Sequence, residues 1–181
     1  MPYSSNSFHA EIVTREIVLD EIAQLRIDAW TANGELPAFI ANQDIRNDEH
    51  DKHAIHFAVM HEEHPVAAAR ICIHATAQAG SDPESLQGYE EMLTPPIATL
   101  SRLVVHPDFR RLGLGFLLTQ ARISVARERR CGCIVGCAEQ PSRMKQLETL
   151  GFNRLGPTKL RYLSYAESFV YMLRMQDKDR S

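Results

Sequence analysis

The sequence contains no long run of apolar residues, and its 181 residues include only four cysteines and one tryptophan. A membrane-spanning helix needs about 18 or more consecutive apolar residues, so none is predicted. The polar start MPYSSNSFHAE lacks the apolar segment of a secretory signal. In a reducing compartment the few cysteines are expected to be thiols and not a disulfide framework. These absences predict a cytoplasmic protein without a membrane partner.

The chain also lacks an excess of positive charge. Its 20 Lys and Arg residues against 23 Asp and Glu residues give a formal net charge of -3. This balance argues against nucleic acid as the main partner. With 44% hydrophobic and 24% charged residues and no internal repeat or linker, residues 1–181 are predicted to form one globular domain with a sizeable core.

Two groups of metal-ligand residue types are present, and their spacing argues against a metal. The cysteines at positions 131, 133 and 137 would share one face of a strand, whereas zinc modules usually use C-x2-4-C pairs in tight turns. They are predicted to be buried thiols. His50, His53 and His56 follow a spacing of three that matches neither one strand face nor an ideal helix face, and no cysteine lies nearby. No metal is predicted at either place.

A strand followed by a glycine-containing turn and a helix organises the chain. Ile97–Val105 (IATLSRLVV) is rich in strand-forming residues, and Pro107 prevents a central strand from continuing. A helix is then predicted to about Arg129, with Gly113 and Gly115 at its first turn, because apolar residues recur at three- and four-residue steps. These apolar residues are Leu114, Leu117, Leu118, Ala121 and Val125.

This turn has the properties of an anion site. A helix N-terminus presents unsatisfied N–H groups and about half a positive charge, which favours phosphate. Arg110 and Arg111 add guanidinium donors suited to a pyrophosphate. Neither the P-loop spacing nor the three-glycine Rossmann pattern is present, so those nucleotide sites are excluded.

The remaining elements are predicted from alternation and periodicity. A charged turn at 61–65 should join two strands into a hairpin, Gly34 should end the first helix, and Ser142 should cap another. The segment 75–96 exceeds an ordinary connection; it is either a surface excursion with one short helix near Ser85–Leu93 or a substrate-site lid. The predicted strands are Phe8–Thr14, Ile55–Met60, Val66–His74, Cys131–Ala138, Phe152–Leu155 and Ser168–Met175, and the helices are Leu19–Asn33 and Ser142–Leu150.

The pattern formed by Val105, Pro107, Arg110, Gly113 and Gly115 resembles the acetyl-coenzyme A motif of the GCN5-related N-acetyltransferase (GNAT) superfamily. The stretch 147–152, LETLGF, is similar to a helix end common there. The resemblance implies an α/β (α+β) fold with a mixed, mostly antiparallel central sheet flanked by helices and splayed at the acyl-CoA site. It also implies an acyl-CoA-dependent N-acyltransferase in which an amine attacks the thioester directly.

The resemblance further implies the binding residues for acetyl-CoA, the co-substrate, with no metal required. Backbone groups of Leu103, Val104 and Val105 would bond the pantetheine arm, and Gln140 could bond its amides in place of a family asparagine. The pyrophosphate would lie against Arg110, Arg111, Leu112, Gly113, Leu114, Gly115 and Phe116.

The family's tyrosine acid falls on Leu147 here, so the catalytic groups are less defined. Glu139, just after the fifth core strand, is the first candidate for a general base. His106, His56 and Ser101 are the alternatives. Arg102 would orient a substrate carboxylate or brace the sheet.

A second resemblance is to the branch of autoinducer synthases and N-acyl amino acid synthases, which also carry a Ser-Arg pair. It rests on Asp48, Asp51, Ala54, His56, Arg70 and the pair Ser101-Arg102.

Three functions follow from these patterns. Acetyl transfer to an amine of a small molecule or protein is favoured. The alternatives are transfer of a longer acyl chain from acyl-CoA or acyl carrier protein, and a non-catalytic coenzyme A sensor. A homodimer stays open. The acceptor pocket is predicted from residues 30–51 and the insertion 75–96, whose Asp82, Glu84, Glu90 and Glu91 would favour a cationic amine.

Overall fold

The computed structural model describes residues 8–32, 49–158 and 167–175. They fall into two compact units, each built from two stretches of chain. Unit 1 comprises Met1–Arg70 and Arg102–Arg122, and unit 2 comprises Ile71–Ser101 and Ile123–Ser181. Gly34 and Asp48 lie outside the described residues. Within the described ranges no helix is long and apolar enough to cross a membrane.

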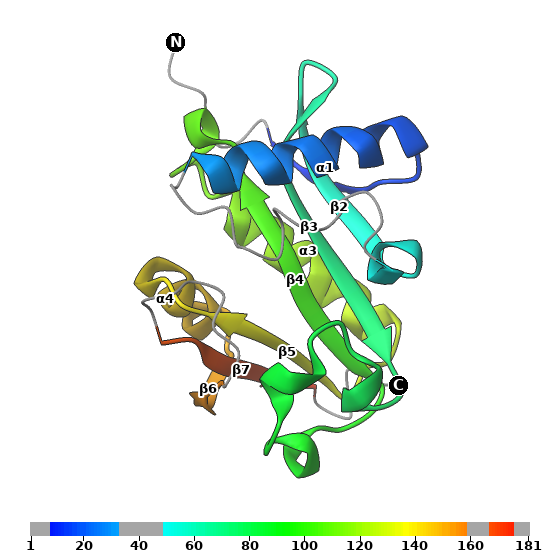
Figure 1. The fold of residues 1–181 in the computed structure, drawn as a ribbon, viewed down its shortest axis with the longest axis vertical. Helices are drawn as coiled ribbons and strands as arrows, with labels where there is room; N and C mark the ends of the chain where they lie inside the picture. Colours follow the sequence, from blue (N-terminus) through cyan, green and yellow to red (C-terminus); the bar gives the residue numbers. More distant parts are fainter. Residues whose placement is uncertain (1–7, 33–48, 159–166, 176–181) are drawn as a thin grey trace. The chain divides into compact units, whose positions relative to one another are not determined.

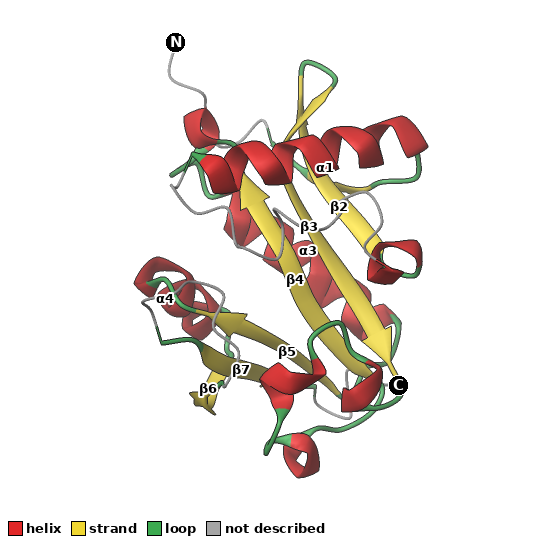
Figure 2. Ribbon diagram, in the orientation of Figure 1, coloured by secondary structure: helices red, strands yellow, loops and turns green. Residues whose placement is uncertain are grey.

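The predicted alternation of strands and helices is confirmed (Figure 2). Ile97–Val105 forms a strand with the predicted bounds, and the helix after it ends one residue before Arg129. The helices and strands are β1 (Ala10–Ile12), α1 (Glu16–Thr31), β2 (Ile55–His61), β3 (His64–His74), β4 (Ile97–Val105), α3 (Leu114–Glu128), β5 (Cys133–Ala138), α4 (Pro141–Thr149), β6 (Asn153–Pro157) and β7 (Phe169–Arg174).

The strands form one seven-stranded sheet in the order β1-β2-β3-β4-β5-β7-β6. β1 with β2, β5 with β7 and β6 with β7 pair antiparallel, whereas β4 and β5 pair parallel. The β4–β5 register ends at Leu100 opposite Gly136, although β4 continues to Val105. This is the mixed, mostly antiparallel sheet that the sequence predicted.

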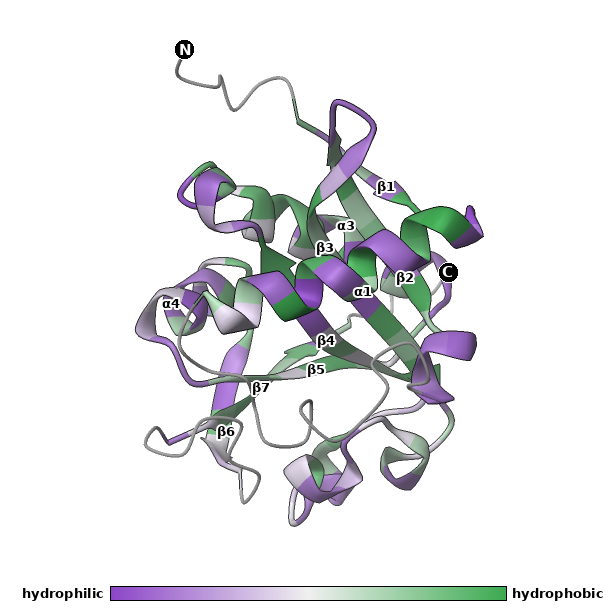
Figure 3. Ribbon diagram, turned by 45° about the horizontal axis from the view of Figure 1, so that its top comes forward, coloured by the Kyte–Doolittle hydropathy of each residue, from purple (hydrophilic) through white to green (hydrophobic). Residues whose placement is uncertain are grey.

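The hairpin between β2 and β3 is confirmed, with a tight turn of two glutamates. Glu62 and Glu63 have φ values of 48° and 70°. Positive φ at both central residues matches the right-handed twist of paired strands, which is why such turns join hairpins. Figure 3 shows this turn as polar and the strands on either side of it as apolar.

The core of unit 1 lies beneath α1. Helix α1 crosses the sheet strands in this unit, and α3 lies behind them (Figure 1). The apolar stripe of α1 packs on strand residues Ala58, Ala68 and Val104, because positions three and four apart share a helix face. The stripe consists of Val18, Ile22, Leu25 and Ala29.

The core of unit 2 lies between the β5–β7 pair and the insertion. Ala77, Leu86 and Leu93 of the insertion are buried against Val135 and Val170. The Tyr89 hydroxyl also donates to the carbonyl of Pro157, at 2.8 Å. The insertion is thus part of the core of unit 2 and not only a surface excursion.

Two local predictions in unit 2 are wrong. The expected short helix near Ser85–Leu93 is two 3-10 turns, Pro83–Leu86 and Glu90–Met92, because Gly88 at φ 91° interrupts the chain between them. Ser142 does not cap α4. Gln140 occupies the N-cap position, since Pro141 takes the first helical turn.

Candidate functional site

The turn between β4 and α3 in unit 1 has the geometry of an anion site. The N–H groups of Phe116 and Leu117 both donate to the carbonyl of Gly113 at 3.0 Å, so the N–H groups before Phe116 precede the first helical bonds. Gly113 has φ 78°, and among the described residues no atom lies within 4 Å of a Cβ built on it. A phosphate could therefore approach these amides closely.

An aromatic cluster fixes the start of this turn, and the sequence patterns did not indicate it. The Phe109 ring lies 5.0 Å from the ring of His61, 5.8 Å from that of His106 and 6.3 Å from that of Phe8. The backbone N–H of His106 donates to the carbonyl of Val66 at 2.8 Å. The ring Nδ1 of His106 accepts the backbone N–H of Asp108 at 3.3 Å. These contacts hold the backbone that leads into the predicted phosphate site.

The two arginines of the turn have different surroundings. Arg110 donates from Nη2 to the carbonyl of Ala29 at 3.2 Å and from Nε to that of Val105 at 3.4 Å, so it ties the turn to the end of α1. Arg111 is exposed and has φ 64°. Both charges lie close in sequence to the helix N-terminus, where they favour an anion. Their direct contact with a pyrophosphate stays a prediction.

Strand β4 carries an irregularity at Arg102, directly before the residues predicted to bind pantetheine. Arg102 has φ 52°, which interrupts the alternation of a regular strand. Its guanidinium lies 5.7 Å from the centre of the Trp30 ring. Beyond it Val104 is buried, and Leu103 and Val105 are half-buried.

A buried ion cluster joins α1, the turn before β2, and β3 in unit 1. Arg26 Nη1 lies 2.8 Å from Asp51 Oδ2, and Arg70 Nη1 lies 2.7 Å from Asp51 Oδ1. The arginine side chains are 3% and 1% exposed and that of Asp51 is 18% exposed. Burial opposes ionisation of Asp51, but the bonds from Arg26 and Arg70 prevail and lower its pKa.

His56 and Arg122 extend this cluster. His56 Nε2 donates to the Asp51 carbonyl at 2.9 Å, and burial lowers the pKa of His56. Arg122 on α3 is fully buried and donates from Nη1 to the Arg70 carbonyl at 3.2 Å. Burial likewise lowers the pKa of Arg26. The structure thus brings together Asp51, His56 and Arg70, which the second resemblance singled out.

Arg26 and Arg122 were not predicted as site residues. The signal was present, since Arg26 follows Ile22 by four residues and precedes Ala29 by three on the apolar stripe of α1. Arg122 likewise falls among the buried residues of α3. A charged residue within an apolar stripe needs a buried partner.

Glu139, the first candidate for the base, and Ser101 lie in unit 2, whereas the alternatives His56 and His106 lie in unit 1. Glu139 follows β5 and is half-buried, Gln140 is the exposed N-cap residue of α4, and Ser101 is half-buried in β4. Leu147, at the position of the family tyrosine, is fully buried. The predicted coenzyme residues 103–116 belong to unit 1, whereas Gln140 belongs to unit 2.

The four cysteines are free thiols, and three of them are buried. The pKa of Cys137 is raised to about 11, mainly by burial, against the lowering effect of Ser85 and with smaller raising effects of Asp82 and Glu139. In the part of the chain that the structure describes, no three His, Cys, Asp or Glu side chains are arranged to hold a metal ion.

Comparison with known proteins identifies the fold. No curated protein sequence matches the chain. Solved structures that it resembles include the ribosomal-protein-S18-alanine N-acetyltransferase from Escherichia coli, at 16% identity and a TM-score of 0.62, covering 93% of this chain and 94% of that one. An N-acyl amino acid synthase, FeeM, from uncultured soil microbes is similar at 15% identity and a TM-score of 0.68, covering 92% and 90%. An agmatine N-acetyltransferase mutant in its apo form is similar at 13% identity and a TM-score of 0.67, covering 93% of this chain and 100% of that one.

A family model settles the classification. The model of the acetyltransferase (GNAT) family matches residues 19–152, a span that includes most of α1, the β4–α3 turn and α4. Both the sequence motif and the sheet order agree with this match. The chain therefore belongs to the acetyltransferase (GNAT) family, and its activity is that of an N-acetyltransferase.

Proposed function

We propose that this protein transfers an acetyl group from acetyl-CoA to the amine of a small molecule or of a protein by direct attack. The β4–α3 turn carries the proposal, because a positive-φ glycine with open space beside it precedes a 15-residue helix. Such a turn can hold a pyrophosphate by its backbone. Residues 1–181 would act as one catalytic domain in the cytoplasm.

In this proposal the donor is held by backbone groups and the acceptor by side chains. Leu103, Val104 and Val105 bond the pantetheine arm, and residues 110–116 hold the pyrophosphate. Glu139 removes a proton from the acceptor ammonium. The amine then forms the new C–N bond as the C–S bond breaks, and the departing thiolate takes up a proton. Gln140 bonds the pantetheine amides.

The test is to compare Gly113→Asp with Gly113→Asn by calorimetry with acetyl-CoA. Both side chains accept the positive φ of this position better than most residues do, so the pair isolates the charge. A carboxylate about 5 Å from one phosphate charge costs about 3 kcal/mol at an effective dielectric constant of about 20. Gly113→Asp should therefore bind acetyl-CoA roughly 100-fold more weakly than Gly113→Asn. Equal affinities would place the coenzyme elsewhere, and no binding by the unaltered protein would overturn the proposal.

A longer acyl donor is the second candidate, and one observation favours it. Asp51, His56 and Arg70, three residues of the second resemblance, meet in a buried cluster, and FeeM is named an N-acyl amino acid synthase. Rates with acetyl-CoA and with a long-chain acyl-CoA separate the two candidates. Coenzyme binding without turnover of any acyl donor would instead indicate a sensor domain.

A further inference from the structure

The four carboxylate side chains of the insertion differ in how exposed they are to solvent. Glu84, Glu90 and Glu91 are exposed, and a Glu90 carboxylate oxygen accepts the N–H of Gly88 at 2.7 Å. Asp82 is half-buried. Glutamates that face water are strongly screened, so Asp82 is the insertion carboxylate best placed to act on a bound group.

Asp82 is held in place near the end of β5. Its carbonyl accepts the Ser85 N–H at 3.0 Å and the Ser85 hydroxyl at 2.6 Å. The Ser81 hydroxyl donates to Asp82 Oδ2 at 3.3 Å. Ser85 is buried, and Cys137, two residues before Glu139, packs against the core cluster that contains Leu86. Asp82 and Glu139 both raise the pKa of the Cys137 thiol, in addition to the larger effect of burial.

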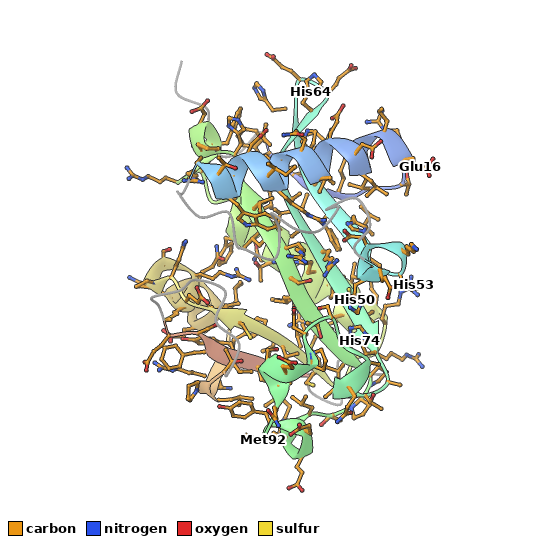
Figure 4. The ribbon with its side chains drawn as sticks, viewed as in Figure 1. Glu16, His50, His53, His64, His74 and Met92 are labelled. Carbon is orange, nitrogen blue, oxygen red and sulfur yellow. The ribbon has the colours of Figure 1, made fainter. Side chains whose placement is uncertain are left out.

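A buried hydroxyl without a partner faces the same part of the insertion. Thr99 is 8% exposed, and its Oγ1 has no hydrogen-bond partner among the described residues. A Cβ built on Gly80 would lie 3.8 Å from this oxygen and 3.8 Å from Cδ2 of His74. Figure 4 shows His74 near the end of β3, beside the turns of the insertion. A buried hydroxyl that makes no hydrogen bond carries a desolvation penalty, so a ligand that hydrogen-bonds it would remove that penalty.

Thr99 also lies on the side of β4 that the insertion covers. Ile97, two residues earlier, belongs to the core that contains Leu86 and Leu93 of the insertion. Residues two apart in a strand share a face. One region of unit 2 thus contains Thr99, the end of β5, and Asp82 at the start of the turn Pro83–Leu86.

We propose that Asp82 and Thr99 bind an ammonium group of the acceptor. The inference rests on the proposed function and assigns it a substrate class: alkyl amines that carry a second ammonium group and no carboxylate at that end. An ammonium offers three donors, and the carboxylate of Asp82 and the hydroxyl of Thr99 both accept. Glu139 adds a second negative charge, which disfavours a carboxylate at this place.

The test uses the full chain saturated with coenzyme A and two ligands of matched length, 1,4-diaminobutane and 4-aminobutanoate, titrated in a calorimeter. The diamine should bind more tightly than the amino acid. Asp82→Asn should weaken diamine binding by about tenfold or more, because a charged hydrogen bond is lost. Thr99→Val keeps the shape of the side chain and should weaken it by about threefold. Glu84→Gln, in the 3-10 turn that follows Asp82, should leave diamine binding unchanged.

Coenzyme A affinity serves as the control for folding and should be the same in all variants. The inference is overturned if 4-aminobutanoate binds as tightly as the diamine, if the unaltered protein does not bind the diamine, or if Asp82→Asn binds like Glu84→Gln. In each of these cases coenzyme binding, and with it the proposed function, would stand. Loss of coenzyme A binding by the unaltered protein would overturn both.

Discussion

Removal of the Asp51 charge should destabilise the protein by about 3 kcal/mol. Breaking a buried ion pair by removing one partner costs about 3–5 kcal/mol, because the remaining charge is left uncompensated. Arg26 and Arg70 are almost fully buried, whereas Asp51 is 18% exposed, so the lower end of that range applies. Asp51→Asn keeps the size of the side chain and removes only its charge.

The assay is thermal unfolding followed by circular dichroism. For a chain of this length each kcal/mol shifts Tm by about 2–4 °C, so Asp51→Asn should lower Tm by about 6–12 °C. Asp20→Asn is the matched control, because Asp20 is exposed in the same unit. If the two variants differed by less than about 2 °C, the cluster would not stabilise the fold.

The pH dependence of stability gives an independent check on the same cluster. The folded-state pKa of Asp51 is lowered by its two arginines against the effect of burial. Its contribution is therefore present above the unfolded-state pKa of about 4 and is lost as pH falls through the folded-state value. The unaltered protein should lose more stability than Asp51→Asn between about pH 5 and pH 3. Parallel losses would contradict the assignment.

Two further predictions concern catalysis and packing in unit 2. Glu139→Gln should lower kcat by a factor of roughly 10²–10⁴ with little change in acetyl-CoA affinity. The control Glu128→Gln, at an exposed position at the end of α3, should leave kcat unchanged. Full activity of Glu139→Gln would transfer the role of general base to His106, His56 or Ser101. Gly132→Ala should cost about 1–3 kcal/mol in urea unfolding, because its Cβ would collide with the backbone of Thr94. A midpoint unchanged relative to the exposed Gln120→Ala would show that the Thr94 segment can move aside.

The β4–α3 turn could be predicted from the sequence because the residues that determine it are close together in the chain. A strand, a proline and a glycine pair with the right spacing fix the backbone over a dozen residues, and β4 has the predicted bounds. The hairpin at Glu62 and Glu63 was similarly local. The start of α1 was placed three residues late, since its N-cap residue Arg15 makes no side-chain capping bond that a sequence pattern could reveal.

The ion cluster and the structure of the insertion could not be predicted, because both depend on tertiary contacts. Arg26 and Asp51 are 25 residues apart in the chain, and the spacing of charges along a sequence does not specify such a pair. The insertion has weak periodicity, yet Leu86 and Leu93 are buried in the core of unit 2. Its four carboxylates were expected to favour a cationic amine together, whereas Asp82 is half-buried and the three glutamates are exposed.

The proposed donor site uses backbone groups and the proposed acceptor site uses side chains, so substitutions report on the two halves of the reaction in different ways. Donor binding through backbone N–H groups depends on φ and on free space, so changes at Gly113 should report on it and changes at neighbours such as Leu112 should report mainly on packing. Acceptor binding through side chains depends on charge, so Asp82 and Glu139 are the informative positions. The Gly113→Asn/Asp82→Asn double variant measures the coupling between the two halves. A change in binding free energy that departs from the sum of the two single effects would show that occupancy of one site alters the other.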